Sequence, residues 1–275
     1  MRRLDGKVAI ISGSGRGIGR ELAFKLAGQG ASVVVNDLDE APANEVVTQI
    51  RDAGGTATAC VGDVTADEFG ERFVRTALET FGGLDIIVNN AGYTRDGVIQ
   101  KQTDEQFQAM LDVHVSAPFR ILRAAAEPLR TMARKEAAEG REVIRKVVNI
   151  SSMAGTHGNA GQINYSAAKS ALVGMTKTLS KEWGRLKVCV NCVAFGIIDT
   201  RLTQPISGSE ASIPIGGQPL HTGIPSAVRD ALLDSVPLGR AGTAREAADS
   251  IYLLCVPESD YISGQVLVVS GGLSL

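Results

Sequence analysis

The chain has 275 residues, of which 44% are hydrophobic, and a formal net charge of −2 at pH 7. That length is enough for one large α/β domain with a sizeable core, and no linker, repeat or low-complexity tract divides it, so we expect a single domain over residues 1–275. The charge gives no basic excess for nucleic acid or an anionic membrane surface. No apolar run approaches the length of a membrane span and no signal segment begins the chain, so we expect a soluble, cytoplasmic protein.

The cysteines and histidines do not predict a metal or redox site. Cys189 and Cys192 form a C-x-x-C, but they lie in a strand-like run, where residues three apart point to opposite faces. His114, His157 and His221 are scattered without the spacing of metal ligands. We therefore expect no bound metal and no disulfide framework.

The first motif in chain order is KVAIISGSGRGIGR, residues 7–20. A short apolar run, read as a buried strand, is followed by Gly13, Gly15, Gly17 and Gly19 and then by the helix-forming ELAFKLA. Open backbone N–H groups, the helix dipole and the absence of side chains make such a turn an anion site that a phosphate can approach. Taken alone, the loop leaves open an ordinary strand-to-helix turn.

Polar residues follow the next apolar runs as well. The apolar run 31–36 is followed by Asp37, which lies beyond the glycine loop near the offset of about 20 residues at which an acidic side chain binds the adenosine ribose. An aspartate that caps a helix is the alternative. Asp63 closes the run 56–61, and Asn90 follows the run 84–88. Helical segments at 43–53 and 68–81 separate these runs, which predicts a doubly wound parallel sheet with right-handed crossovers. Gly13, Asp37, Asp63 and Asn90 then share the carboxyl edge of the sheet, where ligands bind.

The middle of the chain predicts a long helix from Thr103 to about Arg123 and a fifth strand over 146–150 that ends at Ser151-Ser152. Residues 132–145 mix both charges densely, and we interpret them as a solvated helical extension.

The last third predicts an irregular insertion and the end of the sheet. From 201 to 237 the pattern loosens, and a long segment without regular structure beside the site favours a substrate lid. A helix over 244–254 and a strand over 266–269 complete about seven strands.

The helix expected around 164–183 carries the candidate chemistry. Tyr165 and Lys169 are four residues apart and share one face. A tyrosine titrates near ~10, and an adjacent ammonium together with a cationic nicotinamide ring favours the phenolate and lowers the pKa. Tyr165 then becomes an acid or base near neutral pH; a chance pair on a helix surface is the alternative.

Together, SGSGRGIG, NNAG, Ser152 and Tyr165-x-x-x-Lys169 resemble the short-chain dehydrogenase/reductase family over essentially the whole chain. The segment GTHGNAGQ before Asn164-Tyr165 is typical of the branch that reduces β-ketoacyl thioesters. The resemblance implies a single Rossmann-type domain, a nicotinamide cofactor and interconversion of a secondary alcohol and a ketone. It favours 3-oxoacyl or 3-hydroxyacyl thioesters of acyl carrier protein or CoA, as in fatty acid metabolism, and a homodimer or homotetramer packed through the last helix and strand.

By position, the resemblance makes Tyr165 the acid/base, Lys169 the residue that lowers its pKa and holds the nicotinamide ribose, and Ser152 the hydrogen-bond donor to the substrate carbonyl. The implied cofactor-binding set is Gly13, Arg16, Gly17, Ile18, Gly19, Asp37, Asp63, Val64, Asn90, Tyr165, Lys169, Ile198 and Thr200.

Two positions depart from the family pattern. His114 stands where the family has an asparagine that supports a proton-relay water, and we expect the histidine to sustain the relay or simply to pack. Phe195-Gly196 replaces a Pro-Gly and puts in doubt how the nicotinamide amide is held.

Asp37 favours NAD over NADP, because a 2′-phosphate would face its carboxylate, although Arg16 favours NADP. The alternatives to a thioester reductase are a dehydrogenase of a cyclic alcohol, sugar or steroid-like hydroxyl, and a non-catalytic nucleotide sensor. The complete Ser152, Tyr165 and Lys169 set argues against the sensor.

Overall fold

A seven-stranded parallel sheet forms the centre of the computed structural model, which describes residues 2–206, 212–215, 218–221 and 223–273. The strand order is β13-β6-β5-β4-β1-β2-β3, and every neighbouring pair is parallel. The strands are β1 (Val8–Ile11), β2 (Ser32–Val35), β3 (Thr56–Ala59), β4 (Ile86–Asn89), β5 (Arg145–Ser152), β6 (Val188–Phe195) and β13 (Val266–Val269). The expected doubly wound, Rossmann-type sheet is confirmed, and its strand order reverses between β1 and β4.

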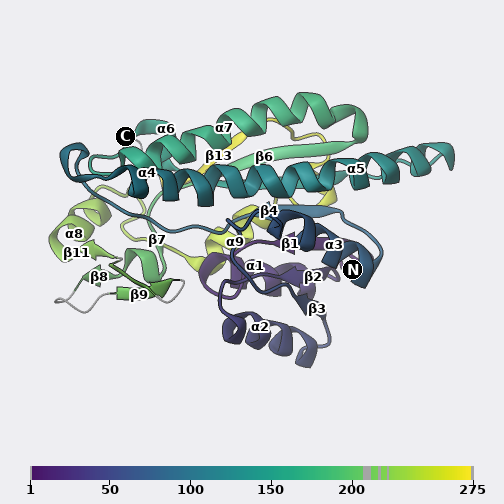
Figure 1. Cartoon of the computed structure of the whole chain (residues 1–275), viewed down its shortest axis with the longest axis horizontal. Coiled ribbons are helices and arrows are strands. Elements are labelled where there is room, and N and C mark those ends of the chain that lie inside the picture. Colours follow the sequence, from purple (N-terminus) through teal and green to yellow (C-terminus); the bar gives the residue numbers. More distant parts are fainter. Residues whose placement is uncertain (1, 207–211, 216–217, 222, 274–275) are drawn as a thin grey trace.

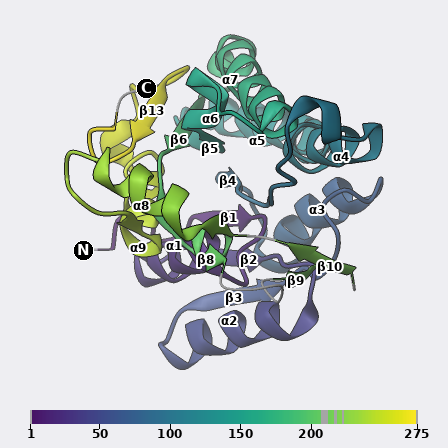
Figure 2. The same ribbon diagram turned by 90° about the vertical axis from the view of Figure 1, so that its left-hand side faces the viewer.

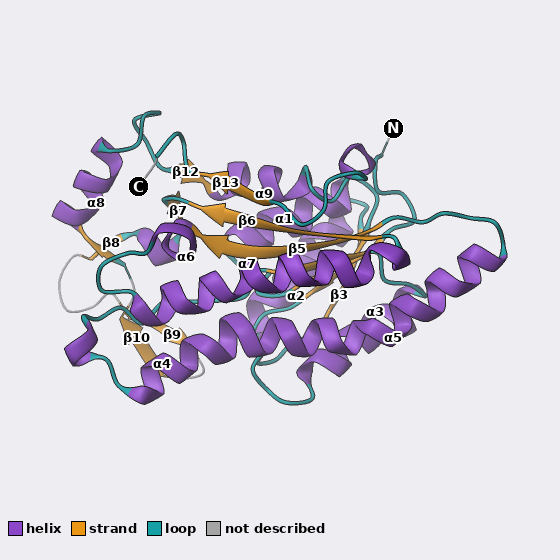
Figure 3. Ribbon diagram, turned by 90° about the horizontal axis from the view of Figure 1, so that it is seen from above, coloured by secondary structure: helices purple, strands orange, loops and turns teal. Residues whose placement is uncertain are grey.

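Helices cover both faces of this sheet (Figures 1 and 3). On one face, α1 (Gly17–Gly28), α2 (Glu40–Asp52) and α9 (Ala244–Tyr252) contribute Leu22, Val46 and Ile251 to one buried cluster. On the other, α3 (Phe69–Phe81), α5 (Ala117–Ala138) and α7 (Ile163–Trp183) contribute Phe73, Ile121 and Ala168 to a second. Between them, β1, β4 and β6 are buried on both faces, as their continuous apolar runs predict.

The single helix expected from Thr103 to about Arg123 is wrong in detail. Thr103 begins α4 (Asp104–Leu111) through a capping box with Gln106, but a π-helical turn at Asp112–Ser116 separates α4 from α5. The pattern of apolar residues cannot reveal a turn with one extra residue, so it predicts a continuous helix. Such π-turns are frequent at functional sites. Helix α5 takes the charged segment only as far as Ala138.

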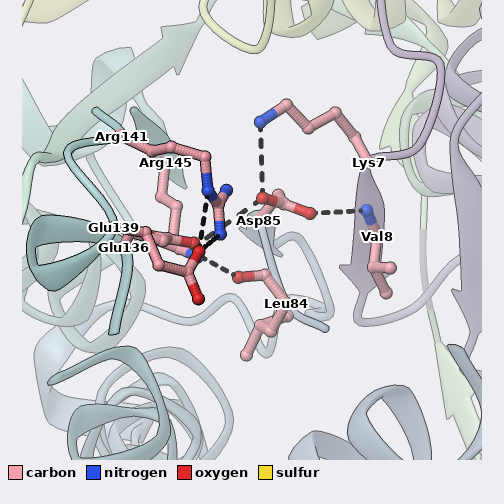
Figure 4. A network of polar contacts seen from close by, with 8 residues as sticks. All are labelled: Lys7, Val8, Leu84, Asp85, Glu136, Glu139, Arg141 and Arg145. Atoms are coloured by element: carbon pink, nitrogen blue, oxygen red, sulfur yellow. Dashed lines mark hydrogen bonds and ion pairs between the residues drawn. The ribbon is translucent and has the colours of Figure 1, made fainter. Parts of the chain in front are cut away.

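Arg145, whose side chain is 4% exposed, fastens the end of α5 to the amino edge of the sheet (Figure 4). Its guanidinium donates to both carboxylate oxygens of Glu136, at 2.8 and 2.5 Å, and to the Leu84 carbonyl at 3.1 Å. Asp85, 3.9 Å from Arg145 Nε, accepts the Val8 backbone N–H at 2.9 Å. The charges are therefore paired and hydrogen-bonded where the helix returns to β5.

Arg145→Leu should lower the free energy of unfolding by about 3–5 kcal/mol, because it leaves the Glu136 carboxylate without its buried partner. Urea unfolding measures the change. Arg141→Leu is the matched control: its pair with Glu139 has side chains 54% and 42% exposed, so its loss should leave the free energy of unfolding nearly unchanged. Equal losses in the two variants would contradict a special role for the buried pair.

The segment 201–237 was expected to lack regular structure, and this is wrong for the residues that the structure describes. It holds a 3₁₀ turn at Arg201–Thr203, the strands β8 (Pro205–Ile206), β9 (Ser212–Ile215), β10 (Gln218–His221) and β11 (Ile224–Pro225), and helix α8 (Ser226–Asp234). β9 and β10 pair as an antiparallel hairpin, while β8 and β11 pair in parallel. Figures 1 and 2 show these elements together at one end of the main sheet, beyond β7 (Ile198–Asp199).

A search of the helices in the described part of the chain finds none with the length and apolar character that crossing a membrane requires.

Candidate active site

A cavity of about 640 Å³ lies along the carboxyl edge of the sheet, within the usual size of a ligand site. Most of the residues singled out from the sequence line it, namely Gly13, Arg16, Gly17, Ile18, Asp37, Asp63, Val64, Asn90, His114, Ser152, Tyr165, Lys169, Ile198 and Thr200. Gly19 is not part of the lining. The structure therefore brings residues from eight parts of the chain into one cleft.

The glycine loop fits a phosphate because its packing leaves no room for side chains. Gly13 has φ +63° and a Cβ there would lie 2.7 Å from the Ala91 Cα, while a Cβ at Gly19 would lie 2.8 Å from the Ser14 Cα. Gly17, at φ +54°, has nothing within 4 Å of its Cβ position and begins α1 facing the cleft. The N-terminal amides of α1 are thus open to an anion, as a dinucleotide site requires.

Ser12 and Asn90 hold this loop against β4. The Ser12 hydroxyl accepts the backbone N–H groups of Asn90 and Ala91, each at 3.0 Å. The Asn90 side-chain amide donates to the carbonyls of Ser12 and Gly13 at 3.0 and 2.9 Å. Asn90 therefore shapes the loop through its amide group.

At the end of β2, Asp37 is 8% exposed and pairs with Arg16 at 2.9 Å. Arg16 also pairs with Asp39 at 3.0 Å, a residue that the sequence reasoning missed although it forms a short D-x-D with Asp37. Burial raises the pKa of Asp37, while the backbone N–H of Asp39 and the charge of Arg16 lower it. Both guanidinium ends of Arg16 are therefore engaged by carboxylates.

Near the other end of the cavity, β5 and α7 position the candidate chemical groups. Ser152 ends β5 and accepts the Ala154 backbone N–H at 3.2 Å as the N-cap of α6 (Met153–His157). Tyr165 and Lys169 lie on one face of α7, with Lys169 Nζ 5.5 Å from the tyrosine ring centroid. Lys169 is 4% exposed, and its ammonium group donates a hydrogen bond to the Ile150 carbonyl at 2.7 Å.

The groups of the protein that shift the pKa of Tyr165 do not include Lys169, so the expected lowering of this pKa by Lys169 and a nicotinamide cation stays a prediction. Desolvation of the buried phenol raises the pKa of Tyr165 to about 12, the Ser152 hydroxyl lowers it by hydrogen bonding, and the Asp96 charge raises it. Burial also lowers the pKa of Lys169, to about 8. The lysine is directed to a backbone carbonyl, so desolvation dominates the titration of both groups.

The shifted pKa of Lys169 predicts a pH dependence of stability. Its folded pKa of about 8 lies below the ordinary value of 10.5, so between these values the unfolded chain binds more protons and stability rises with pH. Relative to Lys169→Met, the wild type should gain about 2 kcal/mol in free energy of unfolding from pH 7 to 9.5. Urea titrations of both proteins at the two pH values measure this. A constant difference would mean that the ammonium is not desolvated.

His114 lies in the π-helical turn with 2% of its surface exposed. Its Nε2 donates to the Tyr93 carbonyl at 2.8 Å, which leaves Nδ1 as a buried acceptor without a partner among the described residues. The ring meets that of Tyr165 edge-on at 5.2 Å. Burial and the Lys169 charge hold the pKa of His114 well below 6.5, so the imidazole is neutral.

Tyr93, Arg95 and Asp96 also line the cavity, and sequence reasoning missed them. Gln162 donates to the Asp96 carboxylate at 2.8 Å, and the Asn164 amide donates to the Arg95 carbonyl at 2.9 Å. These contacts join the segment after β4 to the start of α7. The charged pair Arg95-Asp96, which follows NNAG after two residues, was the available signal in the sequence.

At the departure Phe195-Gly196 the backbone packs closely against β13. The Gly196 N–H donates to the Val269 carbonyl at 3.0 Å, and a Cβ at Gly196 would lie 3.0 Å from the Ser270 Cα. Ile198, 6% exposed, follows in β7 and lines the cavity with Thr200. The chain direction after β6 is thus maintained by packing against β13 and the residue after it.

Within the described residues no group of three or more histidine, cysteine or acidic side chains is arranged to hold a metal ion. All four cysteines are buried free thiols, so Cys189 and Cys192 form no disulfide.

The chain belongs to the short-chain dehydrogenase family, whose model matches residues 7–211. It is therefore an oxidoreductase that acts on CH–OH groups with a nicotinamide cofactor. Its relatives include proteins named 3-oxoacyl-[acyl-carrier-protein] reductase FabG. That of Vibrio cholerae is 36% identical over 271 residues, 98% of each chain. That of Thermotoga maritima is 32% identical over 271 residues, 98% of this chain and 99% of its own. That of Escherichia coli is 34% identical over 269 residues, 98% of each chain.

Proposed function

We propose that this protein interconverts 3-oxoacyl and 3-hydroxyacyl thioesters, carried by acyl carrier protein or CoA, with NAD(H). The observation that carries the proposal is one cavity that Ser152, Tyr165 and Lys169 line together with the glycine loop and with Tyr93, Arg95 and Asp96. The FabG relatives, similar over nearly their whole length, support the thioester as substrate class.

The cofactor would be held by the glycine loop, Arg16, Ile18, Asp37, Asp63, Val64, Asn90, Ile198 and Thr200, with Lys169 beside the nicotinamide ribose. When bound, the nicotinamide supplies a hydride to the ketone carbon or takes one from the alcohol. Its positive charge, together with Lys169, opposes the desolvation that raises the pKa of Tyr165.

In the reducing direction, Tyr165 Oη gives its proton to the substrate oxygen while the Ser152 hydroxyl donates a hydrogen bond to the same oxygen. Ser152 lies near enough to Tyr165 to lower the pKa of its phenol, so the two groups can act on the same substrate oxygen. Lys169, whose pKa is about 8, holds a proton that it can release at neutral pH. In the oxidising direction the same protons move in reverse.

We propose that His114 supports the proton relay behind Lys169 as a neutral hydrogen-bond acceptor through Nδ1. His114→Asn should therefore stay active, because its amide keeps an acceptor, while His114→Leu should lower kcat by about tenfold or more. Steady-state rates at saturating substrate measure both variants. Full activity in the leucine variant, with an unchanged melting temperature, would show that the histidine only packs.

We propose the segment 201–237 as a substrate lid, since Leu202, Ile224 and Leu232 line the cavity from it. A cap on one side of the reacting groups fits a substrate with a short reactive end and a long tail that leaves the cleft. For the assembly we propose a homodimer or homotetramer. The edge strand β13 supports this, because Leu267 and Val268 are 38% and 43% exposed on it; light scattering gives the mass.

The test of the proposed function is kcat/KM for acetoacetyl-CoA with NADH, beside cyclic ketones and sugars. A thioester reductase should fall in the ordinary range of about 10⁴–10⁸ M⁻¹s⁻¹. A value below about 10² M⁻¹s⁻¹ next to a much better cyclic substrate would replace the thioester with a cyclic alcohol as the substrate class. No turnover with any substrate would favour a nucleotide sensor.

A further inference from the structure

The cofactor half of the cavity contains a second arginine, Arg201, on the segment that follows β7. Arg201 lines the same cavity as Gly13, Gly17 and Asp37, which lie in the glycine loop and at the end of β2. Arg16 is occupied by Asp37 and Asp39, whereas Arg201 forms no ion pair and donates no side-chain hydrogen bond to any of the described residues. The loop and this segment thus each contribute a cation, and only the first is neutralised within the described protein.

The backbone that carries Arg201 is closely fixed. Thr200 and Thr203 cap the 3₁₀ turn reciprocally: the Thr203 hydroxyl accepts the Thr200 N–H at 3.0 Å, and the Thr203 N–H donates to the Thr200 carbonyl at 3.0 Å. The Thr203 hydroxyl also donates to the Ile198 carbonyl at 2.5 Å. β7 in turn pairs with β12 (Gly242–Thr243). Arg201 therefore projects from an anchored turn at the cavity edge.

Arg201 lines the cavity together with Arg16 and with Asp37 and Asp39 at the end of β2. Burial and the positive charge of Arg16 lower the pKa of Arg201, and the charges of Asp37 and Asp39 raise it. These are the charges that surround the end of β2. Because both aspartates pair with Arg16, Arg201 is left without an ion-pair partner among the described residues and can meet the charge of a phosphate in this part of the site.

We propose that Arg201, on the segment after β7, binds a phosphate of the dinucleotide cofactor together with the glycine loop. The amides of α1 meet one side of the pyrophosphate, and a guanidinium supplies charge-assisted, two-pronged hydrogen bonds to another. The proposal rests on the nicotinamide cofactor and deepens the account of its binding, but it does not depend on the thioester substrate.

The same contact links the cofactor to the segment over the substrate. Arg229 of α8 donates to the Thr203 carbonyl at 3.2 Å and lies 3.7 Å from Asp199. A phosphate bound to Arg201 would therefore stabilise the turn that α8 contacts through Arg229. Leu232 of α8 lines the cavity, so this contact reaches the segment over the substrate.

Calorimetric dissociation constants test the proposal without turnover. NADH, NADPH, ADP-ribose and adenosine are titrated into the wild type, Arg201→Met, Arg201→Lys and a control, Arg185→Met. Arg185 is exposed in the 3₁₀ turn Gly184–Leu186 before β6 and does not line the cavity. Arg185→Met therefore removes the same charge at a site away from the cofactor. We expect Arg201→Met to weaken NADH and ADP-ribose about tenfold, with adenosine unchanged, partial retention in Arg201→Lys and no change in the control.

The arms also identify the phosphate. Equal weakening of NADH and NADPH assigns the contact to the pyrophosphate, and weakening of NADPH alone assigns it to the 2′-phosphate. Unchanged affinity for all four compounds, or an equal loss for adenosine, overturns the proposal. Failure of the wild type to turn over acetoacetyl-CoA would remove the proposed substrate and leave these affinities untouched, so the two failures are distinguishable.

Discussion

Tyr165→Phe should lower kcat by about 10²-fold or more while the dissociation constant of NADH stays nearly unchanged. The change removes one hydroxyl and leaves the ring, which packs edge-on against His114 at 5.2 Å, so the fold of the cleft is retained. Because that hydroxyl carries the transferred proton, its loss acts on the chemical step. Steady-state kinetics with a thioester substrate and a separate NADH titration measure the two quantities.

Tyr93→Phe is the matched control, since Tyr93 lines the same cavity and loses the same atom. It should retain most of the wild-type kcat, because the contact with His114 is made by the Tyr93 backbone carbonyl. Wild-type turnover in Tyr165→Phe would exclude Tyr165 as the acid/base. Comparable losses in both variants would point to a general change in the cleft.

NADH should be preferred over NADPH by more than about 10²-fold in kcat/KM. A 2′-phosphate would meet the buried carboxylate of Asp37, and each 1.4 kcal/mol of such repulsion is a factor of about ten. The structure strengthens this expectation, because Arg16, the residue that favours NADP, is paired with Asp37 at 2.9 Å and with Asp39 at 3.0 Å. Measuring kcat/KM with both cofactors gives the ratio.

Two substitutions separate the charges at this position. Asp37→Ser removes the carboxylate nearest the expected ribose and should lower the preference for NADH by at least about tenfold. Asp39→Ser leaves Asp37 in place and should change the preference less, although it releases one end of Arg16. Comparable kcat/KM values for the two cofactors in the wild type would show that Arg16 compensates for Asp37.

Local patterns were sufficient for the sheet and for most of the cavity lining. The apolar runs predict strands buried on both faces, and the residues after β1, β2, β3 and β4 lie at one edge because parallel strands point the same way. The Tyr165 and Lys169 pair follows from helical spacing alone. The glycine positions also follow from the sequence, since only glycine permits the close approach of the loop to Ala91.

Other features depend on segments far apart in the chain. Asp39 and Arg201 join the cofactor end through contacts and charges that no spacing encodes, and Gln162 meets Asp96 only after α7 packs beside the segment following β4. The short strands of 201–237 form by pairing with one another, so their isolated sequences carry little signal.

The sequence by itself determined the fold class, the glycine loop and the identity of the candidate catalytic side chains, because these depend on residue type and short-range periodicity. The tertiary structure decided the pKa shifts of the candidate catalytic side chains and the direction in which each side chain points. Lys169 points to the Ile150 carbonyl, the π-helical turn at Asp112–Ser116 buries His114 against Tyr165, and desolvation raises the pKa of Tyr165 to about 12. The physical reason is that burial and the dielectric surroundings of a charge are set by all the elements packed around it, whereas helical and strand patterns are set by neighbours in the chain.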